Sequence, residues 1–454
     1  MFAATVASAC LFASIVVRQW GDAGRWPARA FALLASGPLF TGTYSYALGL
    51  AALLATLRAL QSGRTWLAIV AAGFTLGFSP LAFVFLCLVL VALAAVQRRA
   101  RSRTIAVAAG ILLLAALQVA ALKAFPTEGR YPFRSWELLA VVAVCASGAL
   151  LAARAPRGGV LASLFALWAA ASLVFYLVPS PVGENLTRPR SLVFPLMLLA
   201  VLLARAAPRW LAFAALSSAL FYNVAPYAGA ALDGSDGRAA RKPFWQPALR
   251  YLASHSSPSY RVEVVPTAGH WEAYWVPKFG FALARGWYRQ IDYAENRVLY
   301  RKPLTAVRYR AWLRAMGVRF VVLPNTRLGH MGAGREARLL RSGASGLRRA
   351  FTTRDASVYE LRAATPILTG PGRAQITNLG HARIEGWTAA AGEHLLRVRY
   401  TPYWQLRKGA LCLERSPDGM TLVRIGSPGR FVLAVGQTPA AIVKTMLQGS
   451  RARC

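Results

Sequence analysis

Long apolar runs, each close to the length of a membrane-spanning helix, dominate the first half of the chain. A helix that crosses a bilayer needs about 20 mostly apolar residues, and the run 105–123 meets this requirement most clearly. The shorter segment 30–40 contains Gly37-Pro38, which favours either a further crossing or a half-helix. The pattern predicts about nine or ten helices: 2–17, 41–60, 66–79, 81–97, 105–123, 136–153, 159–178, 191–204 and 210–229, with 30–40 as the tenth.

Beyond residue 230 the apolar runs become short and alternate with polar positions, which is typical of strands and amphipathic helices. We expect an extracytoplasmic α/β domain over 231–365, and alternating segments from about 374 onwards indicate a β-sandwich-like domain with a C-terminal helix over 366–454. The expected fold class is a polytopic α-helical membrane domain, 1–230, followed by a soluble α/β plus β-sandwich domain. The elements expected in the α/β part are helices at 245–254, 304–316 and 335–342 and strands at 260–266, 318–324 and 357–361.

Basic residues between the apolar runs give an orientation, because loops rich in Lys and Arg stay in the cytoplasm. If residue 230 lies outside, the cytoplasmic loops near 58–64, 98–103, 154–157 and 205–209 carry 10 basic residues. The outward loops 123–135 and 179–190 then carry 5. The bias predicts a bacterial cytoplasmic membrane protein whose C-terminal domain is extracytoplasmic.

Composition adds a strong positive charge to this picture. The chain is 56% hydrophobic and 15% charged, and its formal net charge is +36. Nucleic acid is not the expected partner, because no zinc-finger spacing, helix-turn-helix signature or RNP-like aromatic motif is present. Anionic head-groups of membrane lipids are the better match for a basic domain beside a bilayer.

The five cysteines show no metal-binding or redox spacing, so no metal is implied. Cys10, Cys87 and Cys145 fall in apolar runs. Cys412 and Cys454 allow one disulfide bridge, although their distance in sequence gives it no support. Met1 opens directly into an apolar run without a charged flank, which argues against a signal peptide.

The outward loops hold the polar residues that could carry chemistry in the first half. A carboxylate near the membrane surface could act as a general base, and the catalytic candidates are Glu128 and Glu184. Arginine side chains match phosphate oxygens in a bidentate way, so Arg188 and Arg190 are the candidates for binding a lipid phosphate. The alternative is that all of them are interfacial anchors. Arg130, Arg134, Glu137 and Asn185 lie in or beside the same loops.

Aromatic, acidic and basic residues are concentrated in segment 269–300 of the second half. Aromatic rings can stack on the apolar faces of sugars while polar groups bind the hydroxyls. Equally, Trp and Tyr could dock this domain at the membrane interface. The candidate glycan-binding residues are His270, Trp271, Glu272, Trp275, Arg285, Trp287, Arg289 and Asp292.

Several segments resemble bacterial membrane glycosyltransferases of the GT-C type, including the group described as pyruvoyl-tetrahydropterin-synthase-related membrane proteins. They are LFTGTYSYALGLAALLA (39–55), TLGFSPLAFVFL (75–86), SPVGENLTRPRSLVFPLMLLA (180–200), HWEAYWVPKFGFALARGWYRQID (270–292) and MGVRFVVLP (316–324). The resemblance implies transfer of a sugar from a polyprenyl-phosphate-sugar donor to a cell-envelope glycan acceptor outside the cytoplasmic membrane. The family's catalytic Asp or Glu, in the first large outer loop, has no match here.

Two other functions remain open at this point. One is a non-catalytic membrane-anchored protein that binds glycans or assists envelope assembly. The other is a flippase or transporter, which the scarcity of charge within the apolar runs disfavours. The missing catalytic carboxylate and the apolar start also lead us to expect that an N-terminal part of the parent protein precedes Met1. No hydrolase, ATPase, zinc-protease or dinucleotide motif is present.

Overall fold

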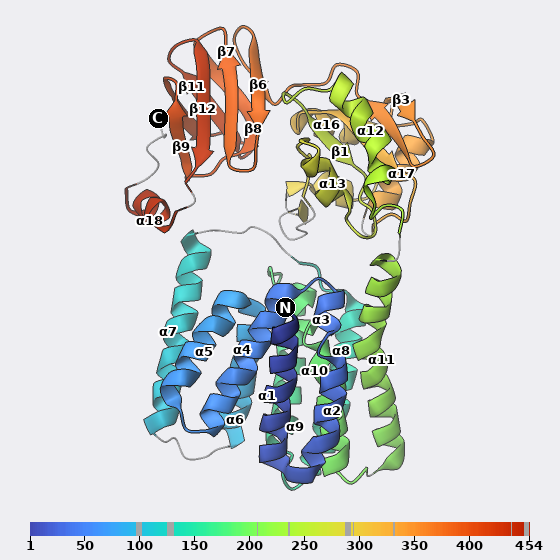
Figure 1. Ribbon diagram of the computed structural model, residues 1–454, viewed down its shortest axis with the longest axis vertical. Coiled ribbons are helices and arrows are strands. Elements are labelled where there is room, and N and C mark those ends of the chain that lie inside the picture. The colour runs from blue at the N-terminus through green and yellow to red at the C-terminus, as the bar shows by residue number, and fades with distance from the viewer. Residues whose placement is uncertain are drawn as a thin grey trace. The chain divides into compact units, whose positions relative to one another are not determined.

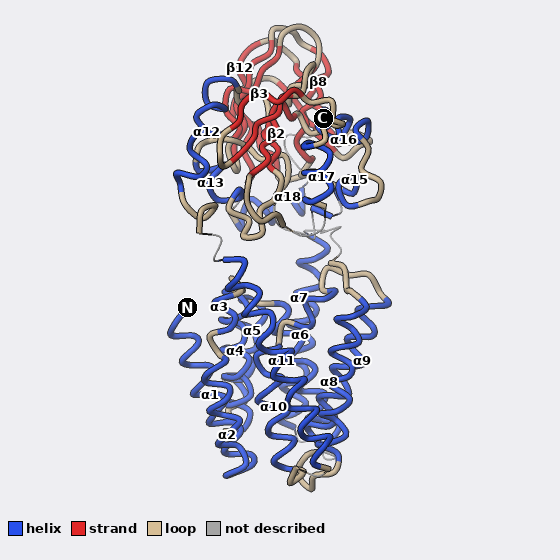
Figure 2. The backbone as a smooth tube through the Cα atoms, turned by 90° about the vertical axis from the view of Figure 1, so that its right-hand side faces the viewer, coloured by secondary structure: helices blue, strands red, loops and turns tan. Residues whose placement is uncertain are grey.

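The computed structural model describes residues 1–96, 102–124, 131–206, 208–234, 237–286, 292–293, 295–329, 332–436, 438–448 and 454. The chain divides into two compact units, Met1–Leu232 and Asp233–Cys454. The first unit is helical and the second contains the sheets (Figures 1 and 2). This coarse division of the expected fold class is confirmed, and its boundary lies within three residues of the predicted one.

The apolar runs of the first unit form helices close to their expected positions (Figure 1). Segment 30–40 is not one continuous helix: α2 ends at Leu34, and the short α3 begins at Gly37, one residue before Pro38. The elements of this unit are α1 (Phe2–Trp20), η1 (Gly21–Gly24), α2 (Arg25–Leu34), α3 (Gly37–Phe40), α4 (Tyr44–Gln61), α5 (Thr65–Phe78), α6 (Pro80–Val96), α7 (Ser102–Ala124), α8 (Ser135–Ala153), α9 (Gly159–Leu177), η2 (Gly183–Thr187), α10 (Arg190–Leu203) and α11 (Arg209–Gly234).

The helices alternate in direction, so the turns between them gather at two ends of the bundle (Figure 1). At one end the Trp20 indole N–H, beside η1, donates to the carbonyl oxygen of Arg157 in the α8–α9 turn at 3.0 Å. We call this the η1 end. The opposite end contains η2, α3 and the start of α8 and α10, and we call it the η2 end. Each of these ends therefore brings together turns that lie far apart in the sequence.

Large apolar side chains fill the centre of the bundle. Phe85 and Trp168 are almost fully buried, and their rings meet edge to face at a centroid distance of 5.0 Å. Helix α8 approaches α9 closely at Gly148, where an added Cβ would lie 2.7 Å from the ring of Phe165. A larger residue at position 148 would therefore push the two helices apart.

The first part of the second unit is a mixed four-stranded sheet with helices packed against it (Figure 2). The strand order is β1-β2-β4-β3, with β1 parallel to β2 and the other neighbours antiparallel. All six expected elements match closely, while α13, α15 and β3 were not predicted. The elements are α12 (Lys242–His255), β1 (Arg261–Val264), α13 (Glu272–Lys278), α15 (Arg297–Tyr300), α16 (Ala306–Ala315), β2 (Val318–Pro324), α17 (Ala333–Arg341), β3 (Arg348–Thr352) and β4 (Ala356–Glu360).

Two four-stranded antiparallel sheets with a shared apolar core make up the rest of the second unit, as the alternating pattern predicts. Their strand orders are β10-β11-β8-β5 and β6-β7-β12-β9. The elements are β5 (Leu368–Thr369), β6 (Ala374–Leu379), β7 (Arg383–Thr388), β8 (Gly392–Arg399), β9 (Trp404–Lys408), β10 (Leu411–Arg415), β11 (Met420–Ile425), β12 (Gly429–Val435) and the helix α18 (Pro439–Gln448).

Arg261 joins the α/β part to the sandwich within this unit. Its guanidinium donates to the carbonyl oxygens of Met316 and Arg397, each at 2.7 Å. Burial, together with the charge of Arg399, lowers the pKa of Arg261 to about 10. The two expected domains therefore pack as one unit around a buried cation.

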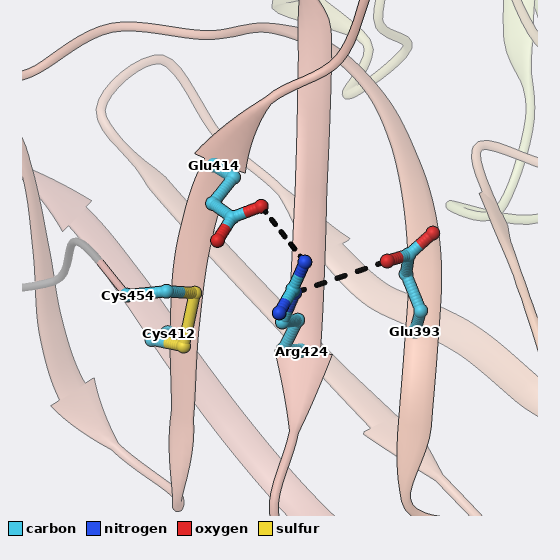
Figure 3. The surroundings of a disulfide bond; sticks show 5 residues. All are labelled: Glu393, Cys412, Glu414, Arg424 and Cys454. Carbon is cyan, nitrogen blue, oxygen red and sulfur yellow. Dashed lines mark ion pairs between the residues drawn. A yellow bond between two sulfur atoms is a disulfide. The ribbon is translucent and has the colours of Figure 1, made fainter.

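Cys412 on the edge strand β10 forms a disulfide with Cys454 (Figure 3). The bridge links residues 42 positions apart in sequence, and the backbone N–H of Cys454 also donates to the carbonyl oxygen of Leu413. On the neighbouring strand Arg424 lies between Glu414 and Glu393 at 3.1 and 3.8 Å (Figure 3). The segment that follows β12 is thus fastened back onto the sandwich.

Candidate functional site

The loop before α8 and the loop after α9 are pinned together at the η2 end. The N–H of Tyr131 donates to the carbonyl oxygen of Ser180 at 2.9 Å. Gly183 has a φ of +44°, and an added Cβ would lie 2.0 Å from the carbonyl oxygen of Tyr131. Only glycine fits both the left-handed backbone and this contact. The position of η2 is therefore fixed against the start of α8.

This contact places Arg134 beside Glu184. The guanidinium donates two hydrogen bonds to the carboxylate, at 2.9 and 2.7 Å. These bonds to Glu184 raise the pKa of Arg134. Arg134 also lies over the ring of Trp136 at 4.8 Å. Glu184 is thus oriented by a bidentate partner rather than turned towards solvent.

A second ion pair lies deeper in the bundle, between Glu137 on α8 and Arg190 on α10. Their side chains are 3.0 Å apart and expose only 3% and 16% of their surface. Arg190 also donates to the hydroxyl of Thr187 at 2.9 Å and stacks over the ring of Tyr222 on α11 at 4.9 Å. We call Arg134, Glu137, Glu184, Thr187, Arg190 and Tyr222 the Arg190 cluster.

Buried polar atoms surround this cluster without hydrogen-bond partners among the residues that the structure describes. Tyr46 interacts electrostatically with Arg188 and Tyr227. Asn223 accepts a bond from the N–H of Phe194 through its oxygen, while its amide nitrogen has no such partner. Buried polar groups nearly always have a partner, so such atoms need an explanation such as water or a ligand. By hydrogen-bond geometry the unpartnered atoms are the hydroxyls of Tyr46, Ser191 and Tyr222 and Nδ2 of Asn223, although Ser191 also interacts with Tyr227 and Tyr222 with Thr187.

The two arginines that the sequence assigns to a lipid phosphate differ in their exposure. Arg188 ends η2 and is exposed, whereas Arg190 begins α10 and is half-buried in the cluster. Of the two catalytic candidates, Glu184 is paired with Arg134, and Glu128 lies outside the described residues. Both arginines nevertheless lie at the same end of the bundle as the unpartnered hydroxyls.

Sequence reasoning did not select Glu137 or Tyr222, which complete the cluster. Glu137 lies in the first turn of an apolar helix and is 2% exposed. A carboxylate inside an apolar run is the one signal that could have found it, because such a group is costly to bury without a partner. Nothing in the sequence around Tyr222 distinguishes it from the other tyrosines.

The predicted glycan-binding residues around α13 are largely turned inwards. The carboxylate of Glu272 is buried and accepts hydrogen bonds from the N–H and hydroxyl of Thr267, and it pairs with His270 at 3.2 Å. Trp271 and Trp275 pack against an apolar core of the α/β part. Neighbouring Tyr274 is the aromatic residue of α13 that is half-exposed. Trp287 and Arg289 lie outside the described residues.

Arg285 and Asp292, also expected to bind glycans, lie inside the α/β part. Arg285 pairs with Glu263 and Glu336 at 2.8 and 2.6 Å, and its side chain is 5% exposed. Burial opposes the charge of Arg285, but the two carboxylates outweigh it and raise its pKa well above the ordinary range. Burial raises the pKa of Glu263 well above its ordinary value, while Arg285 acts in the opposite direction.

Hydrogen bonds extend this Arg285 network to neighbouring helices. The hydroxyl of Tyr309 donates to Glu336 at 2.6 Å. Asp292, 7% exposed, accepts bonds from Asn296 and Tyr300. These contacts hold Arg285 and Asp292 inside the domain, away from any surface on which a sugar could stack, although Nε of Arg285 has no hydrogen-bond partner among the described residues.

Within the described ranges, no group of three or more His, Cys, Asp or Glu side chains is arranged to hold a metal ion. Comparison of the chain with models of known protein families, with curated proteins and with solved structures found no match. The Arg190 cluster and its unpartnered polar neighbours are therefore the candidate site on geometric grounds.

Proposed function

We propose that this chain is a membrane glycosyltransferase-like protein that binds a polyprenyl-phosphate sugar at the η2 end of its helical unit. The acceptor would be a cell-envelope glycan. The observation that carries the proposal is the Arg190 cluster, whose two arginines lie at the same end of an apolar bundle as Arg188 and the unpartnered hydroxyls. The sequence resemblance to GT-C-type proteins supplies the reaction.

The surface of the helical unit supports a bilayer location. Four helical segments are long and apolar enough to cross a membrane: Phe2–Phe40, Ser135–Ala153, Gly159–Leu177 and Arg209–Leu232. Large apolar side chains point outwards, and Leu139, Phe213 and Phe221 each expose at least 70% of their surface. Such an apolar surface is unfavourable in water, whereas the acyl chains of a bilayer would cover it.

Exposed aromatic residues also mark the two ends of the bundle. Trp26, Trp66 and Trp210 lie beside turns at the η1 end, and Tyr44 and Trp136 lie at the η2 end. Trp and Tyr concentrate at both interfaces of a membrane because one part of each ring system is apolar and another is polar. The positions of these two groups of aromatic residues are consistent with a bilayer whose two surfaces lie at the level of the two ends of the bundle.

Charge and disulfide chemistry support the orientation. The η1 end carries the basic turns such as 154–157 and 205–209, and basic loops favour the cytoplasmic side of a membrane. The second unit contains the Cys412–Cys454 bridge, and disulfides persist in oxidising compartments outside the cytoplasm. A reporter fused after residue 240 should be active only outside the cytoplasm and one inserted at Arg101 only inside. Activity of the 240 fusion inside would overturn the orientation.

The cluster suits the binding of a phosphate ester head-group. Glu137 and Thr187 fix the position of Arg190, while exposed Arg188 lies two residues before it. A phosphate at Arg188 would be attracted by both guanidinium groups, because charge–charge forces act strongly near an apolar bundle. The hydroxyls of Tyr46, Ser191 and Tyr222 could then meet oxygen atoms of the head-group or sugar.

The test replaces Arg188 and Arg190 together with Ala in the full chain reconstituted in nanodiscs. Binding of polyprenyl phosphate should weaken by about 2–5 kcal/mol if both contacts are charge-assisted and shielded from water. The matched control is Arg205→Ala together with Arg209→Ala at the η1 end, which should leave affinity unchanged. Equal affinity of the parent and the Arg188/Arg190 variant would remove the site assignment.

One observation favours the alternative of a non-catalytic membrane-anchored glycan-binding or assembly protein. Glu184 is held by two hydrogen bonds from Arg134, so the carboxylate assigned to catalysis already has a bidentate partner within the fold. Sugar transfer by the intact protein, lost on Glu184→Gln or Glu137→Gln, would support the enzyme. Lipid-phosphate binding without turnover in the parent would support the alternative.

A further inference from the structure

Helix α18, which follows the last strand of the sandwich, exposes an apolar face. Val443, Met446 and Leu447 expose 53%, 55% and 81% of their surface. These positions are three and four residues apart, so they lie on the same side of an α-helix. The start of the helix is defined by Thr438, whose hydroxyl accepts a hydrogen bond from the N–H of Ala441 at 3.2 Å.

The opposite side of α18 is half-buried and carries Ala441, Ile442 and Thr445. Ala441 lies against the end of β12, because a Cβ added to Gly436 would lie 3.2 Å from the Cβ of Ala441. A surface helix of a water-soluble domain normally turns its apolar stripe towards the core and its polar side outwards. In α18 Ala441 and Ile442 are half-buried, but the other large apolar side chains, Val443, Met446 and Leu447, face outwards, which indicates that another apolar phase covers them.

Positive charge accompanies this face. Helical geometry places Lys444 at its border, one position from Val443, and Lys444 is exposed. No acidic residue follows Asp418 in the sequence, while Arg424, Arg430, Lys444, Arg451 and Arg453 do. A helix with an apolar side bordered by cations binds in the plane of an anionic lipid surface.

The sandwich restrains α18 from both sides. Strand β12 ends at Val435, four residues before the helix begins at Pro439. Beyond the helix, the disulfide from Cys454 returns the chain to Cys412 on β10. These two attachments limit the loss of entropy on docking, because the helix is held near the sandwich before it meets a surface.

We propose that α18 docks onto an anionic lipid bilayer, with Val443, Met446 and Leu447 at the level where head-groups meet acyl chains. Lys444 then lies among the lipid phosphates. The proposal relies on the membrane location of the first unit, which holds the second unit close to a bilayer, but not on sugar transfer. The docked helix would give the second unit a second, non-spanning attachment to the membrane.

The experiment measures amide hydrogen exchange of residues 439–448 in the full chain, with one copy in each nanodisc. Discs of phosphatidylcholine with phosphatidylglycerol are compared with discs of phosphatidylcholine alone and with protein held in amphipol without lipid. Exchange should slow by about tenfold or more in the anionic discs, because the helix gains a bilayer contact that opposes its opening. Protection should be weaker in the neutral discs and absent in amphipol.

Two variants separate the apolar and electrostatic contributions. Val443→Ser together with Leu447→Ser should abolish the protection in anionic discs without disturbing the core, because both side chains are exposed. Lys444→Gln should reduce the protection in anionic discs and leave the neutral discs unchanged. Thr438→Ser, the matched control, keeps the hydroxyl cap and should behave as the parent chain does.

Equal exchange of α18 in anionic discs, neutral discs and amphipol would overturn the proposal. Protection that appears only when two copies share a disc would assign the face to a second copy of the chain instead. Polyprenyl-phosphate binding is measured on the same preparations and should be unchanged by Val443→Ser with Leu447→Ser. If the parent chain does not bind polyprenyl phosphate while α18 is still protected from exchange, the proposed function is contradicted and the docking of α18 is not.

Discussion

Two arginines, Arg190 in the helical unit and Arg285 in the α/β part, each lie among carboxylates within the fold, yet their surroundings differ. The Arg285 side chain is 5% exposed, and its partners Glu263 and Glu336 are 0% and 1% exposed. Arg190 is 16% exposed, and Arg134, which joins the same cluster, is 51% exposed. The first network is enclosed by its domain, while the second reaches the surface at the η2 end.

The difference teaches how to separate a structural ion network from a candidate site. Around Arg285 the excess charge is negative and is contained in the core, where the raised pKa of Glu263 relieves it. Around Arg190 the carboxylates and arginines alternate, and buried hydroxyls nearby have no partner among the described residues. Unpartnered buried atoms occur in both networks, at Nε of Arg285 as at the hydroxyls beside Arg190, so the deciding difference is access to the surface. An enclosed network suits folding, whereas polar atoms left over beside a surface suit ligand binding.

The largest effect is expected from Arg285→Met. This change leaves Glu336 and Glu263 without their cation in the core, and breaking a buried pair in this way costs about 3–5 kcal/mol. The free energy of unfolding of the second unit is measured on the full chain by proteolysis in rising urea. Arg424→Ala, at a half-exposed pair, is the control and should cost less than about 1 kcal/mol. Equal losses of unfolding free energy in the two variants would show that burial does not make the Arg285 network more important for stability than an exposed ion pair.

A double-mutant cycle on Glu137 and Arg190 tests the other arginine. We expect the variants Glu137→Gln and Arg190→Met to be coupled by about 0.5–3 kcal/mol in the unfolding of the bundle, because the pair is only partly shielded. Unfolding is followed in mixed micelles with increasing SDS. The exposed pair Asp22 and Arg25, at the η1 end, should show much weaker coupling. Additive effects at Glu137 and Arg190 would mean that the contact contributes nothing.

The pH dependence of the second unit gives the smallest expected effect. The raised pKa of Glu263 means that the folded state holds a proton that the unfolded state releases. Its contribution is fully present below the ordinary carboxyl pKa and is lost as pH rises through the folded value, at most about 1.4 kcal/mol per pH unit. Arg285, Glu336 and Asp292 all influence this group.

Glu263→Gln, a neutral side chain of similar shape, should remove this decline between pH 4.5 and pH 8. The measurement is the urea midpoint of the second unit in the parent and in the variant at each pH. Glu385→Gln, at an exposed pair with Arg383, serves as the control and should retain the decline of the parent. Parallel curves for the parent and Glu263→Gln would refute the assignment of the slope to Glu263.

The helices of the first unit could be predicted because each follows from a local property, the length of an apolar run. The predicted run 191–204, for example, is α10 from Arg190 to Leu203. Strand β3 was missed because its residues, RRAFT, are mostly exposed at an edge and show no alternation of apolar and polar positions. Edge strands with one poorly buried face lack the pattern on which such predictions depend.

The site could be predicted only in part, because its contacts join residues far apart in sequence. Arg190 was selected from its loop, but its partner Glu137 lies 53 positions earlier. In segment 269–300, composition could not show which side chains face the core and which face outwards. Trp271 and Trp275, four residues apart, share the side of α13 that faces the core, while Tyr274 points outwards.

The parallel pairing of β1 with β2 has a consequence for the order in which the second unit is built. Residues 265–317 must be made and brought back on themselves before β2 can pair with β1, and β4 follows only at Ala356–Glu360. Such long-range closure slows folding. During synthesis, β1 therefore leaves the ribosome about 100 residues before its sheet can be completed. Until β2 has been made, a nascent chain carries an unpaired strand, RVEV, whose two valines are buried in the finished fold, which makes this segment a target for chaperones and for proteases.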